Sequence, residues 1–72
     1  MKKFSEILKH ERISNGWTQQ DFADKLGIPR STYKNYETAD EKYNRQPPIE
    51  IIREMAILLE VSVDYLFDLK DL

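Results

Sequence analysis

The sequence contains no cysteine, a single histidine and only two glycines among its 72 residues. Without cysteine there is neither a disulfide framework nor a thiolate metal site, so we expect a protein of a reducing compartment, with the cytoplasm as its location. No apolar run of about 18 residues is present, and the start of the chain leads into a charged segment instead of a signal-peptide core. We therefore expect neither membrane insertion nor secretion.

Residues that commonly carry catalysis or metal binding are also scarce. The only histidine, His10, lies among charged residues of the first predicted helix, without a nearby cluster of acids or nucleophiles, and we interpret it as a surface residue. No metal-binding, phosphate-loop or catalytic-triad pattern is present, so we expect no catalytic residue, no metal site and no cofactor. The sequence indicates a binding protein and not an enzyme.

The charges are divided unevenly between the two halves of the chain. Residues 1–36 carry seven basic and four acidic residues, a net charge of +3, whereas residues 37–72 carry four basic and nine acidic residues, a net charge of −5. Such an asymmetry lets one face meet a polyanion while the other stays in solvent or meets a partner, because distant surface charges are screened. The acidic half can equally serve solubility alone.

Apolar spacing and helix-ending residues divide the chain into helices, and no strand pattern competes. Gly16 and Gly27 lie where left-handed residues would end two of them. Thr18 and Asp21 have the chemistry of an N-cap with a short capping box, and Pro29 is tolerated at a helix start. The five predicted helices cover residues 3–15, 18–26, 30–37, 47–59 and 62–70. The sequence thus predicts one all-α domain over residues 1–72, a compact five-helix bundle.

The predicted helix over residues 47–59 is apolar around most of its circumference, whereas a surface helix needs only one apolar stripe. If Ile52, Ala56 and Leu59 face the core, a second stripe remains to be covered. It would be buried in a fully central helix, or against a second copy of the chain, and the two explanations are compatible. The side chains expected at such a two-fold interface are Ile51, Met55, Leu58, Tyr65, Leu69 and Leu72.

Two short helices joined by a three-residue turn are typical of a helix-turn-helix. Residues 16–37 read GWTQQDFADKLGIPRSTYKNYE. This segment resembles the helix-turn-helix of the phage repressor and Cro family, also called the XRE family, and the similarity extends over about residues 5–67. The resemblance implies a lambda-repressor-like bundle that binds double-stranded DNA as a homodimer. It also implies a transcriptional regulator, in particular a repressor of phage or mobile-element type.

Within residues 30–37 the side chains separate into two faces. Tyr33, Tyr36 and Glu37 share one face through their i, i+3, i+4 spacing, and we expect Tyr33 and Trp17 to fill the core. Arginine can donate twice to guanine and asparagine can pair with adenine, so the outward face suits the major groove. The resemblance implies base contacts at Arg30, Ser31, Asn35 and Lys34, of which Lys34 either reads a base or meets a phosphate.

The start of the helix over residues 18–26 should attract a phosphate, because free N–H groups and the helix dipole gather there. The resemblance implies that Gln19 clamps this phosphate and braces a recognition residue, and that Arg12 forms a shielded ion pair with Glu37. The loop over residues 38–47 is longer than in the family, and its polar side chains either contact phosphates or are simply solvated. The candidate contacts to the DNA backbone are Thr18, Gln19, Gln20, Thr32, Lys42, Asn44 and Arg45.

One alternative keeps the same fold but changes the partner. A protein-interaction module, such as an antitoxin that neutralises a toxin, would use the acidic second half as its docking surface. The salt dependence of DNA binding distinguishes the two hypotheses, because a protein that contacts phosphates must bind less tightly as salt rises.

Overall fold

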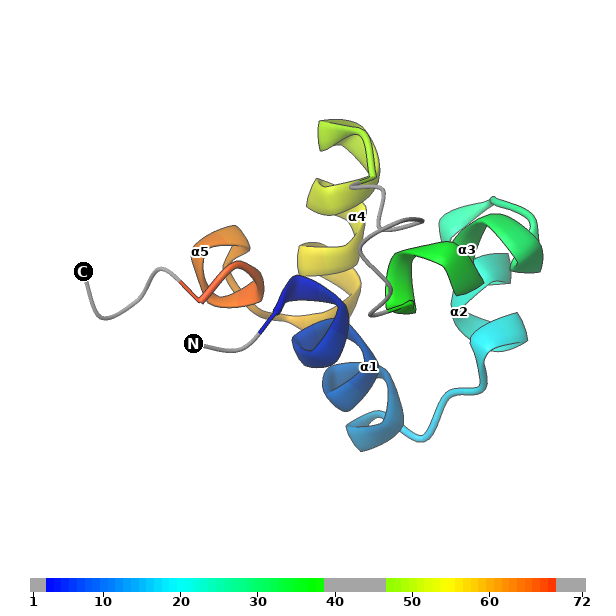
Figure 1. Ribbon diagram of the computed structural model, residues 1–72, viewed down its shortest axis with the longest axis horizontal. Helices are drawn as coiled ribbons and strands as arrows, with labels where there is room; N and C mark the ends of the chain where they lie inside the picture. The colour runs from blue at the N-terminus through cyan, green and yellow to red at the C-terminus, as the bar shows by residue number, and fades with distance from the viewer. Residues whose placement is uncertain (1–2, 39–46, 69–72) are drawn as a thin grey trace.

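The computed structural model describes residues 3–38 and 47–68, and over these ranges the chain is helical without strands. The five helices are α1 (Phe4–Ser14), α2 (Gln19–Leu26), α3 (Arg30–Glu37), α4 (Ile49–Leu59) and α5 (Val63–Leu66). Figure 1 shows α4 in the middle, with α5 on one side and the α2 and α3 pair on the other, while α1 runs below them. The predicted all-α class is confirmed, and the first four helices begin and end within two residues of the predicted bounds.

Local interactions explain where α2 begins and ends. The Thr18 hydroxyl accepts the backbone N–H of Asp21 at 3.0 Å, and the Asp21 carboxylate accepts the backbone N–H of Thr18 at 2.9 Å. This reciprocal capping box satisfies two N–H groups that the helix itself leaves free. The helix ends at Gly27, whose φ of 72° is the left-handed conformation that glycine adopts without steric cost.

The fifth helix is shorter than predicted. The sequence predicted a helix reaching residue 70, but α5 ends at Leu66 and a turn follows over Phe67 and Asp68. Asp68 has a φ of 57°, in the left-handed region, so the right-handed helix cannot continue through it. Ser62 still caps the start, since its hydroxyl accepts the N–H of Tyr65 at 3.0 Å.

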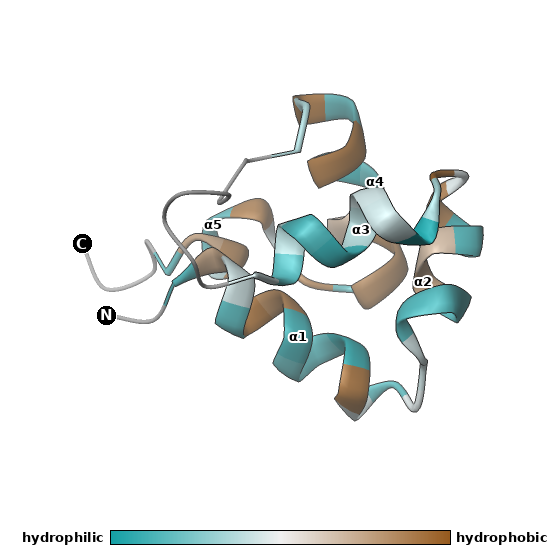
Figure 2. Ribbon diagram, turned by 45° about the vertical axis from the view of Figure 1, so that its right-hand side comes forward, coloured by the Kyte–Doolittle hydropathy of each residue, from teal (hydrophilic) through white to brown (hydrophobic). Residues whose placement is uncertain are grey.

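The core is formed by one face of each helix. Figure 2 shows α4 as the most hydrophobic element, whereas α3 is largely hydrophilic or neutral. Each of the five helices contributes one of the largest fully buried apolar or aromatic side chains, which are Leu8, Phe22, Tyr33, Met55 and Leu66. Among the described residues, no helix combines the length and the apolar character that a membrane span requires.

Contacts between α1 and α5 hold the two ends of the described chain together. The rings of Phe4 and Phe67 stack with their centroids 4.7 Å apart. The Tyr65 hydroxyl donates to the carboxylate of Glu11 at 2.7 Å, and this hydrogen bond raises the pKa of Tyr65. The short α5 is therefore anchored by tertiary contacts, since one turn of helix is not stable alone.

The structure corrects one prediction about α4. Met55 was predicted on a second, partner-facing stripe, but its side chain is fully buried in the core of its own chain. Met55 follows Ile51 by four residues and Ile52 by three, so helix spacing alone allows it on either stripe, and the packing of α4 against the other helices turns it into the core. Met55 therefore does not belong to an exposed interface.

Candidate nucleic-acid interface

The α2–turn–α3 unit presents one polar face and one packed face. Tyr33 is fully buried and Tyr36 is 8% exposed, so α3 is anchored by two aromatic rings. The Tyr33 ring meets Phe22 of α2 edge to face, with centroids 5.3 Å apart. Pro29 supplies no side-chain cap to α3, yet the helix begins at Arg30 as predicted.

The opposite face of α3 carries the predicted base-contacting side chains. All four are exposed, and none of them forms a hydrogen bond or ion pair with the described residues through its side chain. They are Arg30, Ser31, Lys34 and Asn35. Thr32 is half-buried at the edge of this face. The four side chains therefore keep their hydrogen-bonding groups available for a ligand.

Three candidate backbone-contacting residues lie at the start of α2, where the helix dipole is positive. Thr18 and Gln20 are exposed, and the Gln20 amide donates to Asp24 at 2.8 Å. Gln19 is half-buried, and its amide nitrogen donates to the carboxylate of Glu37 at 3.1 Å. In this structure Gln19 thus braces Glu37 at the end of α3, and not a side chain of the exposed face.

The predicted ion pair between Arg12 and Glu37 is present and shielded. Arg12 Nε lies 2.7 Å from Glu37 Oε2, and Arg12 Nη2 lies 3.2 Å from Oε1. The two side chains are 10% and 3% exposed. The remaining guanidinium nitrogen, Nη1, donates to the backbone carbonyl of Trp17 at 2.7 Å. The hydrogen bond to Glu37 raises the pKa of Arg12, so its guanidinium remains charged.

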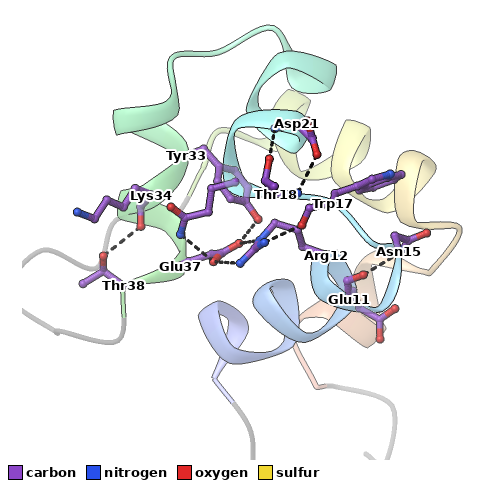
Figure 3. Close-up of polar contacts among 11 residues, drawn as sticks. Glu11, Arg12, Asn15, Trp17, Thr18, Asp21, Tyr33, Lys34, Glu37 and Thr38 are labelled. Carbon is purple, nitrogen blue, oxygen red and sulfur yellow. Dashed lines mark hydrogen bonds and ion pairs between the residues drawn. The ribbon is translucent and has the colours of Figure 1, made fainter.

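Figure 3 shows that further side chains converge on the same carboxylate. The Tyr33 hydroxyl donates to Glu37 Oε2, and Gln19 donates to Oε1. Burial, together with the hydrogen bond to Glu37, raises the pKa of Tyr33. We call this group, Arg12, Gln19, Tyr33 and Glu37, the carboxylate hub. Its contacts from Gln19 and Tyr33 were not predicted, although the i, i+4 spacing of Tyr33 and Glu37 could have indicated one of them.

The single tryptophan lies beside this unit and only partly fills the core. Trp17 is half-buried, and its ring centroid lies 5.2 Å from that of Phe22. The ammonium of Lys25 lies 4.9 Å from the centroid of the Trp17 ring, within the range of a cation–π contact. His10 is exposed, in agreement with its interpretation as a surface residue.

Of the other residues predicted at a dimer interface, three lie in the described part of the chain and two lie outside it. Ile51, Leu58 and Tyr65 are half-buried and pack against the core of their own chain. The exposed large apolar side chains of α4 are instead Ile49 and Ile57, at 53% and 69% exposure. Five predicted site residues lie outside the described part of the chain, namely Lys42, Asn44, Arg45, Leu69 and Leu72.

Comparison with known proteins gives the family. Residues 8–66 match the family described as Helix-turn-helix, which is more than half of the chain. This chain belongs to the helix-turn-helix family. The match covers α2, the turn and α3, together with α4 and α5 and most of α1. The resemblance to the XRE type, which rested on residues 16–37, is thereby confirmed.

Several transcriptional regulators with curated names are similar to this chain. An uncharacterized HTH-type transcriptional regulator of Bacillus subtilis, YqaE, is 43% identical over 63 residues, which is 88% of this chain and 51% of the relative. The prophage-derived regulator YonR of the same organism is 38% identical over 88% of this chain and 55% of its own length. The cryptic phage CTXphi transcriptional repressor RstR of Vibrio cholerae is 34% identical over 89% of this chain and 54% of its own length. The chain thus spans about half the length of these relatives.

Proposed function

We propose that this chain is a sequence-specific DNA-binding transcriptional regulator that inserts α3 into the major groove. The observation that carries the proposal is the division of α3 into two faces. Tyr33 and Tyr36 anchor the helix from below, whereas four polar side chains of the other face are exposed and without partners among the described residues. A rigid helix with free polar tips is what groove recognition requires.

The chemistry of the exposed face suggests a role for each side chain. The guanidinium of Arg30 can donate two hydrogen bonds to O6 and N7 of guanine, and the amide of Asn35 can pair with N6 and N7 of adenine. Ser31 can donate to or accept from a base edge, and Lys34 can reach a base or a phosphate. These four side chains are the proposed base contacts.

Contacts to the sugar-phosphate backbone would set the register of α3 in the groove. We assign this role to residues around the N-terminus of α2, where free N–H groups meet an anion. Three loop residues that lie outside the described ranges, Lys42, Asn44 and Arg45, are proposed to contact further phosphates with two positive charges and one side-chain amide. The proposed backbone contacts are Thr18, Gln19, Gln20, Thr32, Lys42, Asn44 and Arg45.

The regulator is proposed to act as a homodimer, with residues 1–72 as one DNA-binding domain and without catalytic activity. A two-fold dimer would place two copies of α3 about one helical turn of DNA apart. The half-buried Ile51, Leu58 and Tyr65, together with Leu69 and Leu72, are the proposed contact between the copies. The cytoplasm is the proposed location. Repression, as opposed to activation, is supported by the name of the RstR relative.

The direct test is selection of bound sequences from a random duplex library, followed by titration of the selected site at two salt concentrations. We expect an enriched, two-fold related sequence and an affinity that falls steeply as salt rises, because counterions are released from neutralised phosphates. A scrambled duplex is the control for non-specific binding. Weak binding that is independent of salt, without an enriched sequence, would contradict the proposal.

The alternative of a protein-interaction module is not favoured by a specific observation. None of the relatives reported above is named as an antitoxin. We therefore propose no second function.

A further inference from the structure

The Glu37 carboxylate joins three helices at one point. Arg12 reaches it from α1, Gln19 from α2 and Tyr33 from α3 itself, and the Glu37 side chain is 3% exposed. A buried carboxylate that accepts hydrogen bonds on both oxygens is held in one orientation, because any rotation would break several charge-assisted bonds. The hub therefore fixes the direction in which Gln19 is held.

Gln19 is the residue through which the hub reaches the proposed DNA-backbone contact. It is the first residue of α2, directly after the capping box, and its side chain is half-buried. One amide hydrogen is donated to Glu37. The second amide hydrogen and the amide oxygen have no partner among the described residues. The amide is thus held at one end and retains one donor for a phosphate.

We propose that Glu37 is a positioning residue for DNA binding, which orders the Gln19 amide before DNA arrives. This inference rests on the proposed function and assigns Glu37 a role beyond the stability of the fold. A glutamine side chain loses much rotamer freedom when it is immobilised at an interface, and that loss weakens binding. If Glu37 orders the Gln19 side chain in the free protein, this rotamer freedom is already lost on folding, so its loss no longer weakens DNA binding.

The other two members of the hub act through the carboxylate. Arg12 donates to both Glu37 oxygens and also to the carbonyl of Trp17, just before α2. Tyr33 donates to Oε2 from the buried face of α3. The start of α2 and the end of α3 are therefore linked through one group. The phosphate contact and the base-contacting helix should be energetically coupled.

The test compares Gln19→Ala in two backgrounds, the wild-type chain and Arg12→Met/Glu37→Leu. Replacing both members of a buried ion pair by apolar side chains of similar volume often preserves stability, so this background removes the acceptor for Gln19 without leaving a lone buried charge. Thermal unfolding followed by circular dichroism establishes that each variant is folded. The affinity of each variant for the selected duplex is then measured by fluorescence anisotropy of labelled DNA.

In the wild-type chain, Gln19→Ala should weaken binding by about tenfold or more, as expected for a hydrogen bond to a charged group. In the Arg12→Met/Glu37→Leu background, the same substitution should have an effect smaller by about 2- to 12-fold, the factor associated with ordering one such side chain. Equal effects in both backgrounds would overturn the inference. If the double variant does not fold, Tyr33→Phe replaces it and should reduce the effect of Gln19→Ala in the same direction.

Gln20→Ala is the matched control. Gln20 is the neighbouring glutamine at the same helix end, but its amide donates to Asp24 and not to Glu37. Its effect on DNA binding should therefore be the same in both backgrounds, because residues without a shared partner contribute additively. A Gln20 effect that changes with the background as much as the Gln19 effect would indicate a general distortion of α2 and would overturn the inference.

A readout without DNA separates this inference from the proposed function. In the free wild-type protein, the Gln19 side-chain amide proton that is donated to Glu37 should have an NMR shift displaced from that of a solvated glutamine amide and should exchange slowly with water, and both features should be lost in Arg12→Met/Glu37→Leu. The shift and the fast exchange of a solvated amide in the wild type would overturn the positioning role. If Arg30→Ala weakens specific binding but Gln19→Ala does not, only this inference fails; if the wild type binds no duplex, the proposed function fails with it.

Discussion

The Arg12–Glu37 pair links residues 25 positions apart, and both side chains are almost removed from water. Removing one partner leaves the other charge buried without compensation, which is more costly than losing an exposed pair. We expect Glu37→Ala to lower the free energy of unfolding by about 3–5 kcal/mol. Chemical denaturation measures this, with Glu50→Ala, an exposed glutamate on α4, as the control. An unchanged unfolding midpoint would contradict the buried role of Glu37.

Substitutions of the exposed residues of α3, in contrast to Glu37→Ala, should change DNA binding and leave the stability of the fold almost unchanged. Arg30→Ala and Asn35→Ala remove no contact with the described residues, so the stability of the fold should change little. Each should weaken specific DNA binding by roughly 1–3 kcal/mol and relax the preference at one base position. Binding to a panel of single-base variants of the selected site measures this. Lys9→Ala, on the exposed side of α1, is the control and should leave the preference unchanged.

At the scale of elements, the start of α2 depends on an ionised carboxylate. The hydrogen bond from the backbone N–H of Thr18, together with its nearby hydroxyl, lowers the pKa of Asp21 below its ordinary value of 3.8. A group with a lowered pKa in the folded state stabilises the fold above its ordinary pKa, and this contribution is lost as the pH falls through the folded-state value. The stability difference between the wild type and Asp21→Asn should therefore be largest near neutral pH and shrink below pH 3.8. Denaturation at pH 7 and pH 3 measures it, and an equal difference at both would contradict this account.

The end of α4 is under local strain that a single substitution should relieve. Glu60 is the C-cap residue and has a φ of 57°, although it is not glycine. The left-handed conformation costs an L-residue roughly 1–2 kcal/mol of stability, and glycine avoids this cost. Glycine in turn destabilises the folded state by about 0.5–1 kcal/mol, because its unfolded chain has more conformational entropy to lose. We therefore expect Glu60→Gly to stabilise the fold by about 0.5–1 kcal/mol. Glu54→Gly, within α4, should instead destabilise it by about 1 kcal/mol, and the same sign for both in thermal melts would contradict the prediction.

At the scale of the whole molecule, the proposed dimer predicts a fixed distance between half-sites. Paired recognition helices reach successive major grooves about one helical turn, or about 10 base pairs, apart. Inserting five base pairs between the half-sites of the selected operator should place them on opposite sides of the duplex and greatly reduce the affinity. Inserting ten restores the shared face but doubles the distance between the half-sites, so a dimer with a fixed half-site distance should still bind less tightly than to the original operator. Gel-shift titrations of the three duplexes check this, and equal affinities would contradict simultaneous binding of two half-sites.

Much of the architecture could be predicted because it depends on short-range chemistry. Thr18 with Asp21, and Gly27 after the last apolar residue, are local signals for the start and end of α2, and the spacing of Tyr33 and Tyr36 assigned the buried face of α3. The Arg12–Glu37 pair was predicted as well, but from the family resemblance and not from spacing. The roles of Arg30, Ser31, Lys34 and Asn35 toward DNA remain predictions, since the structure shows their exposure alone.

The sequence by itself determined the five helices, both ends of α2 and the two faces of α3, because these follow from interactions between residues at most four positions apart. Tertiary packing decided the rest. It buried the Met55 side chain in the core, although the nearly continuous apolar sequence of α4 left open which way this side chain points. It also brought Gln19 to Glu37 across 18 residues, a contact that depends on how α2 and α3 cross. Such long-range contacts follow from the relative orientation of helices, which no local pattern in the chain encodes.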